Sequence, residues 1–293
     1  MNLILTVLNI VGPVMILAAI GYGWSRLGYD YPISFVTQLA MTFAVPCLIF
    51  VALMSSQIET DALAELTLAS LVGYVAIALV FLAVLWMSGL SLQTFLAPLT
   101  FGNTGNLGLP LALFAFGDDG LGYAVVVFAV TTILAFTVGA WVVAGAGSLT
   151  RMLREPIVWA TVLGGVFVWQ GWQTPLILTN ALELVGQMAI PLMLITLGVA
   201  LARLQAQSLG RALGLAVLKL GVCVAVAFGV ATVFALDPIA SAVLIVQLAT
   251  PVAVTSYLLA QKYGADGQAV ASLVVVSTLL AVVSLPLILS FVI

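Results

Sequence analysis

The side chains best suited to bind a small ligand lie in one glycine-rich stretch, residues 102–110, with the sequence GNTGNLGLP. Asn103 and Asn106 each offer an amide donor and an amide acceptor, and Thr104 adds a hydroxyl group. Pro110 has no N–H group and disfavours helical dihedrals at the residue before it. The stretch therefore predicts a helix break that forms part of a binding site; the alternative is a kinked helix that serves packing alone.

A second stretch of this kind contains Thr250 and Pro251. The polar residues around it, Gln247, Thr255 and Ser256, are candidates for the same site, although hydrogen bonding between helices explains them equally well. A broken helix exposes N–H groups and the positive end of its dipole where its second half begins, which favours a carboxylate. The freed carbonyl groups could instead hold a cation or water.

The composition places both breaks inside a membrane protein. Of the 293 residues, 64% are hydrophobic and 6% are charged, whereas about a quarter of the residues in soluble domains are charged. Within a bilayer, a helix break must be buried in protein or line a watery cavity. The chain has no histidine, and its two cysteines lie apart in apolar runs, so we expect no metal, no cofactor, no disulfide and no enzyme activity.

Apolar runs of roughly the length that crosses a bilayer, about 20 residues, follow one another along the chain. The ten runs cover residues 4–22, 33–54, 63–87, 92–116, 121–145, 156–172, 177–201, 210–235, 239–261 and 268–291. We therefore predict an all-α integral membrane protein with ten transmembrane helices.

The charged residues predict how these helices are oriented. Basic residues such as Arg26, Arg203 and Lys262 lie in loops on one side, whereas the opposite loops contain acidic residues such as Asp118 and Asp237 but no basic residue. The positive-inside rule then places both termini on the non-cytoplasmic side of the plasma (inner) membrane.

Two charged residues lie well inside apolar runs, more than a turn from either end. Glu183 is about one and a half turns from the outer end of its run, where it is either a proton carrier or a solvated residue at an entrance. Lys219 is about two turns from the basic end of its run, and we expect its side chain to snorkel to the interface.

The two halves of the chain resemble each other. Pro46 and Pro191 occupy similar surroundings about half a chain length apart, as do the sequences FGDDG and YGADG. Because five runs separate equivalent elements, the halves must have opposite orientations, a plan typical of secondary transporters with a site at the midplane. We predict two inverted five-helix repeats, residues 1–146 and 147–293, in which the broken helices four and nine cross at the site.

These motifs resemble those of the auxin efflux carrier family, whose bacterial members are similar to the plant PIN proteins within the bile-acid, arsenite and riboflavin transporter superfamily. The likeness extends over essentially the full chain and is carried by residues 103–110, 250–256 and 263–266 with Ser277, Thr278 and Pro286.

The resemblance implies a scaffold of helices one, two, six and seven, often dimeric, and a transport domain of helices three to five and eight to ten that moves as an elevator. Family substrates include auxins and small mono- or dicarboxylates such as malonate or malate. The chain differs from long plant PIN proteins in its short loop after the fifth run. It differs from sodium-coupled bile-acid relatives because its ninth run has no acidic residue.

We therefore predict a bilayer-embedded carrier, as a homodimer through its scaffold helices, that exports or exchanges small organic anions and has no nucleic-acid partner. Its predicted substrate-binding residues are Asn103, Thr104, Asn106, Pro110, Gln247, Thr250, Pro251, Thr255 and Ser256. The alternatives are sodium- or proton-coupled uptake of carboxylates or bile-acid-like anions, with Glu183 as the proton site, and a channel or sensor on the same fold.

Overall fold

The computed structural model describes residues 3–55, 58–144, 156–204 and 209–293, and these residues form helices without any β-strand. The first half contains α1 (Leu3–Arg26), α2 (Ile33–Leu39), α3 (Val45–Met54), α4 (Thr60–Ser88), α5 (Leu92–Thr100), α6 (Leu109–Leu134) and α7 (Ala140–Ala144). Short π-helices connect some of them: η1 (Ala40–Ala44), η2 (Thr104–Gly108) and η3 (Ala135–Gly139). The second half contains α9 (Pro156–Gln170), α10 (Leu176–Gly186), α11 (Ala189–Arg203), α12 (Leu209–Val233), α13 (Pro238–Leu248), α14 (Val254–Lys262) and α15 (Gly267–Val292).

Seven stretches of the described residues are long and apolar enough to cross a membrane, which confirms an all-helical membrane protein. They are Leu5–Arg26, Ile33–Met54, Thr60–Ser88, Thr104–Ala144, Leu176–Arg203, Leu209–Val233 and Gly267–Val292. The sixth predicted span and the first half of the ninth form shorter helices, α9 and α13. The count of ten spans therefore stays a prediction, and the predicted boundary between the repeats, at residues 146 and 147, lies outside the described residues.

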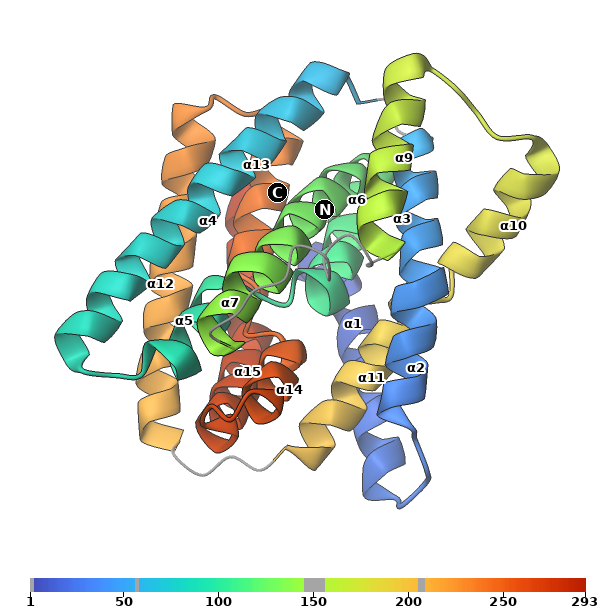
Figure 1. Cartoon of the computed structure of the whole chain (residues 1–293). Helices are drawn as coiled ribbons and strands as arrows, with labels where there is room; N and C mark the ends of the chain where they lie inside the picture. Colours follow the sequence, from blue (N-terminus) through green and yellow to red (C-terminus); the bar gives the residue numbers. More distant parts are fainter. Residues whose placement is uncertain (1–2, 56–57, 145–155, 205–208) are drawn as a thin grey trace.

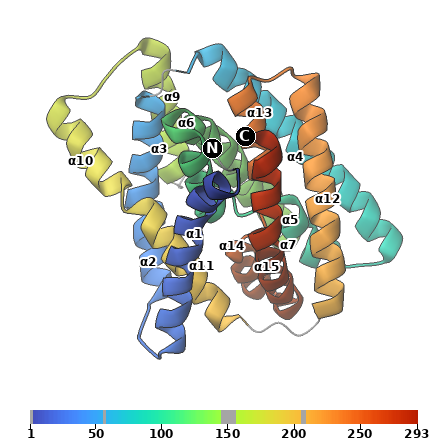
Figure 2. The ribbon, with the colours of Figure 1, turned by 180° about the vertical axis from the view of Figure 1, so that it is seen from behind.

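The helices form two groups, seen from opposite sides in Figure 1 and Figure 2. The first helix group contains α1, α2, α3, α9, α10 and α11, with α1 packed along α11 and α3 packed against α9 and α10. The second helix group contains α4 to α7 and α12 to α15, with α12 packed against α4, α13 and α15.

The ends of the molecule differ in charge. The last turns of α1, α11 and α14 contain Arg26, Arg203 and Lys262. These three helices end in the lower part of the molecule in Figure 1. The first turn of α4 contains Asp61, and α13 is capped by Asp237 at the upper end. This polarity is the one that the loop charges predict, and we call the two ends the basic end and the acidic end.

A turn before the first break and a bend after it lie at opposite ends of the molecule. Gly89 ends α4 in the left-handed conformation (φ 65°), which glycine adopts without a steric cost. Ser91 then caps α5 by accepting a hydrogen bond from the Thr94 N–H. At the acidic end, Gly117 (φ 65°, ψ −151°) bends α6 sharply at the position where the fourth and fifth predicted runs meet. A short helix therefore approaches the break from each end of the molecule.

The snorkelling predicted for Lys219 is wrong. Its side chain is 2% exposed, and Nζ donates to Sγ of Cys223, which lies one turn further from the basic end of α12. The physical reason is the face on which it lies: Ala212, Ala216 and Ala227, at helical spacing from Lys219, are also buried. The lysine therefore points into the protein rather than toward lipid or water.

Candidate functional site

The first break separates α5 from η2 and contains Phe101, Gly102 and Asn103. The Asn103 side chain caps the second half, because its Oδ1 accepts the Asn106 N–H at 3.2 Å. Pro110 lies in the first turn of α6, where a residue without an N–H group is tolerated. The break itself lies at residues 101–103, where a new helix starts. The prediction that Pro110 interrupts the helix is wrong, because Leu109 before it keeps helical dihedrals (φ −59°, ψ −51°) and η2 continues into α6.

The second break, between α13 and α14, runs from residue 249 to residue 253. The Thr250 hydroxyl donates to the Gln247 carbonyl at 2.6 Å, and the Val252 N–H donates to Ser277 Oγ at 3.1 Å. Buried side chains thus satisfy backbone groups that the interrupted helix leaves free, as the interior of a membrane protein requires.

The two breaks lie against each other. Gly102 and Val252 form an antiparallel bridge, and the Asn103 N–H donates to the Pro251 carbonyl at 2.7 Å. A Cβ atom at Gly102 would collide with Thr250 Oγ1, so the close approach of the two chains requires glycine here. Segments about half a chain length apart therefore share one short stretch of backbone pairing.

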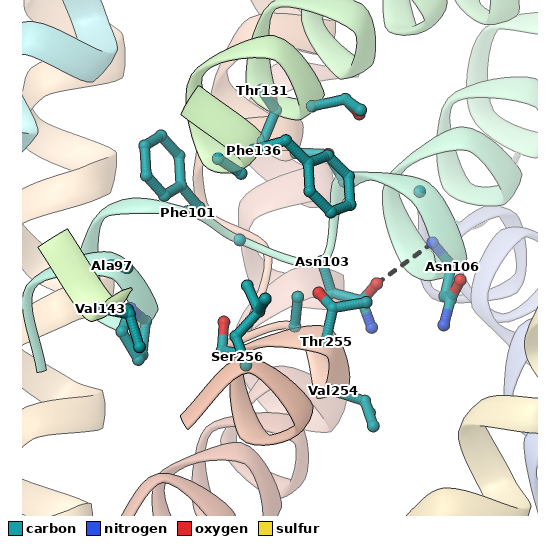
Figure 3. Close-up of a pocket in the computed structure, with 18 of the residues that line it drawn as sticks. Ala97, Phe101, Asn103, Asn106, Thr131, Phe136, Val143, Val254, Thr255 and Ser256 are labelled. Carbon is teal, nitrogen blue, oxygen red and sulfur yellow. Dashed lines mark hydrogen bonds between the residues drawn. The ribbon is translucent and has the colours of Figure 1, made fainter. Parts of the chain in front are cut away.

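A cavity of about 90 Å³ lies beside this pairing. Five of the predicted site residues line it: Asn103, Thr104, Asn106, Thr255 and Ser256. All of these except Thr104 are labelled in Figure 3. The first turns of η2 and α14 both border the cavity, so N–H groups and the positive ends of two helix dipoles meet there. None of the described residues that line the cavity is charged.

The amide of Asn103 has a free donor in this cavity. Asn103 is 5% exposed, and its Nδ2 is buried without a hydrogen-bond partner in the described part of the chain. Because Oδ1 accepts a backbone N–H group, the orientation of the amide is fixed and the NH₂ group must be the free side. A buried donor without a partner is costly, so an acceptor that reaches it gains from the contact.

Four other predicted site residues do not line the cavity: Pro110, Gln247, Thr250 and Pro251. Gln247 is fully buried, donates from Nε2 to the Ala124 carbonyl at 3.4 Å, and contacts the Gly108 position of η2 closely enough to exclude a Cβ atom there. Of the two interpretations of Gln247, its contacts favour hydrogen bonding and packing between helices.

Glu183 lies in a different cavity. This larger space, about 590 Å³ between α3, α10 and the Gly117 bend, also contains Asp118 and Asp119 and belongs to the acidic end. Glu183 is exposed there and does not line the cavity at the breaks. Of the two roles predicted for Glu183, this exposed position at the acidic end fits a solvated residue at an entrance.

Sequence reasoning missed the apolar wall of the cavity. The side chains of Met41, Phe101, Phe128, Phe136 and Leu259 all line it. Only Phe101 had a signal in the sequence, since it directly precedes the glycine-rich stretch; the others come from η1, α6, η3 and α14, which only the tertiary structure brings together.

A cavity between two interrupted helices inside an apolar helical protein is the arrangement in which membrane carriers hold their substrates. The chain belongs to the family described as "Membrane transport protein", which includes the auxin efflux carriers, because the family model matches residues 6–150 and 141–289. The predicted family resemblance is therefore confirmed.

Two relatives support this membership. An "Uncharacterized transporter" of Methanothermobacter thermautotrophicus is 28% identical over 288 residues, which cover 94% of each chain. A "Putative malonate transporter" of Rhizobium meliloti is 25% identical over 297 residues, which cover 94% of this chain and 92% of the relative.

Proposed function

We propose that this protein is a secondary carrier of small carboxylates that binds them in the cavity between the two breaks. The observation that carries the proposal is the buried Asn103 Nδ2, which has no partner among the described residues and lies beside two helix N-termini. A carboxylate oxygen is the acceptor that such a donor and two positive dipole ends favour together.

The lining of the cavity favours a monocarboxylate with an apolar body. Polar groups gather around Asn103 and Ser256, whereas Phe101, Phe128 and Phe136 offer aromatic surface to the rest of the ligand. A second carboxylate would need its own donor on this apolar wall. The name of the Rhizobium relative makes malonate the natural competitor in any test.

The architecture that fits this function is the predicted one of ten spans in two inverted repeats, residues 1–146 and 147–293. The first helix group corresponds to the scaffold and the second helix group to the transport domain of an elevator. Thr94, Val143 and Leu259 line the cavity on the side of the basic end, so this conformation presents the site to the cytoplasm. Homodimerisation through the scaffold belongs to the same proposal.

The membrane potential favours export or exchange of an anion over its uptake. A membrane potential that is negative inside drives an anion outward by about 2.3 kcal/mol per charge per 100 mV. The plasma membrane, with both termini outside, is the location consistent with the basic end facing the cytoplasm. Sodium- or proton-coupled uptake is the runner-up, and Glu183 as its proton site would have to act from the separate acidic cavity. A channel would instead show flux without saturation or counter-exchange, and a sensor would bind the ligand without moving it.

Reconstituted vesicles test the proposal with Asn103→Ala and Asn106→Ala, measured for exchange of labelled indole-3-acetate and labelled malonate. We expect at least tenfold slower exchange in Asn103→Ala, because the buried, unpartnered Nδ2 donor of Asn103 is lost. The matched control is Asn180→Ala, which removes an exposed asparagine on α10. Wild-type vesicles that exchange neither anion, or an Asn103→Ala protein as fast as wild type, would refute the proposal.

A further inference from the structure

A buried lysine lies at the depth of the breaks but outside the cavity. Lys219 is about 15 Å along α12 from Leu209, at a rise of about 1.5 Å per residue. The nine-residue α5 starts from the same end of the molecule and stops at the first break at a similar depth. An ionisable side chain within the bilayer is costly and in most cases functional.

Lys219 has no carboxylate partner in the described part of the chain. Its Nζ donates to Cys223 Sγ at 3.6 Å, and both side chains are buried. The elements packed against α12 are α4, α5, α13 and α15. Their acidic residues lie near helix ends, in the first two turns or at a cap: Glu59, Asp61, Glu65, Asp237 and Asp266. The ammonium group therefore lacks the compensating charge that burial requires.

A short series of contacts connects this lysine to the cavity wall. Cys223 and Tyr74 of α4 belong to the same buried cluster, where α12 packs against α4. The Tyr74 hydroxyl is hydrogen-bonded to the Thr131 hydroxyl at 2.6 Å, and the Tyr74 ring lies 5.7 Å from the Phe101 ring. Thr131 and Phe101 both line the cavity (Figure 3). Lys219 is thus behind the wall, on the side opposite the ligand.

We propose that Lys219 is the counter-charge of the bound carboxylate. Its ammonium group attracts the ligand through the low-dielectric wall that contains Tyr74, without touching it. Because α12 belongs to the second helix group, the lysine moves with the site, and the domain loaded with a monocarboxylate carries no net charge from the pair. Lys219 is therefore a specificity-determining residue that selects anions. The inference rests on the proposed function and adds the charge of the moving unit.

The proposal has a consequence for voltage dependence. In exchange of one monocarboxylate for another, only the loaded carrier crosses the membrane. If Lys219 neutralises the ligand, the membrane potential does no work on that step, and exchange is insensitive to voltage. If Lys219→Met removes the charge, the loaded carrier becomes an anion, and a potential of 100 mV slows its unfavourable crossing about sevenfold when half the field acts on that step.

The experiment measures exchange of labelled indole-3-acetate in proteoliposomes at 0 and −100 mV, set by potassium gradients with valinomycin and corrected for flux into protein-free vesicles. The proteins are wild type, Lys219→Met, Lys219→Arg and Lys262→Met. The last is the matched control, since Lys262 is the other lysine of the chain and is exposed at the basic end.

We expect the rates of wild type, Lys219→Arg and Lys262→Met to differ less than about 1.5-fold between the two potentials, and Lys219→Met to become voltage-sensitive. Voltage-sensitive exchange by the wild type would overturn the inference, even if Lys219→Met failed to fold. Voltage-insensitive exchange by a folded Lys219→Met protein would also overturn it. Absence of any saturable flux through the wild type would instead refute the proposed function.

Discussion

The amide of Asn103 serves two purposes at once. Its Oδ1 caps the helix that starts at η2, and its Nδ2 is left as a buried donor in the cavity. Because the cap fixes the orientation of the amide, the free donor is held in place before any ligand arrives. This preorganisation separates Asn103 from Asn106, whose side chain also lines the cavity but caps nothing in the described residues.

Replacing Asn103 by aspartate separates the two roles. In Asn103→Asp, a carboxylate oxygen still accepts the Asn106 N–H, so the helix start is retained. The donor is lost and a negative charge faces the ligand, so we expect carboxylate binding to weaken more than tenfold. Isothermal titration with indole-3-acetate in detergent measures this, with Asn180→Asp as the control for an added charge. Equal affinity of Asn103→Asp and wild type would contradict the role given to Nδ2.

A substitution of Gln247 tests whether this residue belongs to the proposed binding site. Its amide packs between Gly108 and the Ala124 carbonyl, and its Oε1 is buried without a partner in the described residues. Gln247→Met keeps the length of the side chain and removes the unsatisfied oxygen, so we expect affinity for carboxylate within about twofold of wild type. The same titration measures it. A tenfold loss of affinity would return Gln247 to the binding site.

At the scale of elements, the pairing of the two breaks is what makes the site. Each interrupted helix alone would leave free N–H and C=O groups inside the membrane. The bridge between Gly102 and Val252, the Pro251 carbonyl and the Ser277 hydroxyl satisfy part of these groups, and the N–H groups at the helix starts remain for a ligand. If the proposed site is correct, the stability of the fold and the binding of the ligand depend on the same close approach.

Gly102→Ala is expected to destabilise the protein, because the added Cβ atom collides with Thr250 at the tightest contact between the breaks. Overpacking of this kind costs about 1–3 kcal/mol. Thermal unfolding in detergent measures the difference, with Gly12→Ala as the control, since a Cβ atom at Gly12 of α1 has nothing within 4 Å. An unchanged melting temperature for Gly102→Ala would show that the breaks can separate without loss.

At the scale of the whole molecule, two cavities face opposite ends. The cavity at the breaks extends along α5 and α14 toward the basic end, and the cavity with Glu183 belongs to the acidic end. A cavity open toward only one end at a time is what alternating access requires. The first and second helix groups pack against each other where α1, α3 and α9 contact α6 (Figure 1). In the proposed elevator mechanism, this interface would be the plane of movement.

Thiol labelling tests this sidedness. In a background without Cys47 and Cys223, we expect Leu259→Cys to react with an impermeant maleimide only from the cytoplasmic side and to be protected at least threefold by bound carboxylate. The control, Ser55→Cys in the acidic cavity, should react from the opposite side without protection. Labelling of Leu259→Cys from the outer side of right-side-out vesicles would contradict the proposed orientation.

The sequence by itself determined the membrane class, the family and the positions of both breaks. Hydrophobic runs and loop charges report on the bilayer, and glycine and proline act on their own backbone, so these features are local and readable from the chain. Only the tertiary structure decided which polar residues reach the cavity, because that depends on which face of a helix meets a distant segment. In the structure, Gln247 and Thr250 do not line the cavity, Phe128 and Phe136 do, and Lys219 is buried in the protein. The side chain of Lys219 could not be placed from sequence, since its distance from the basic end was known but the helices that pack against its face of α12 were not.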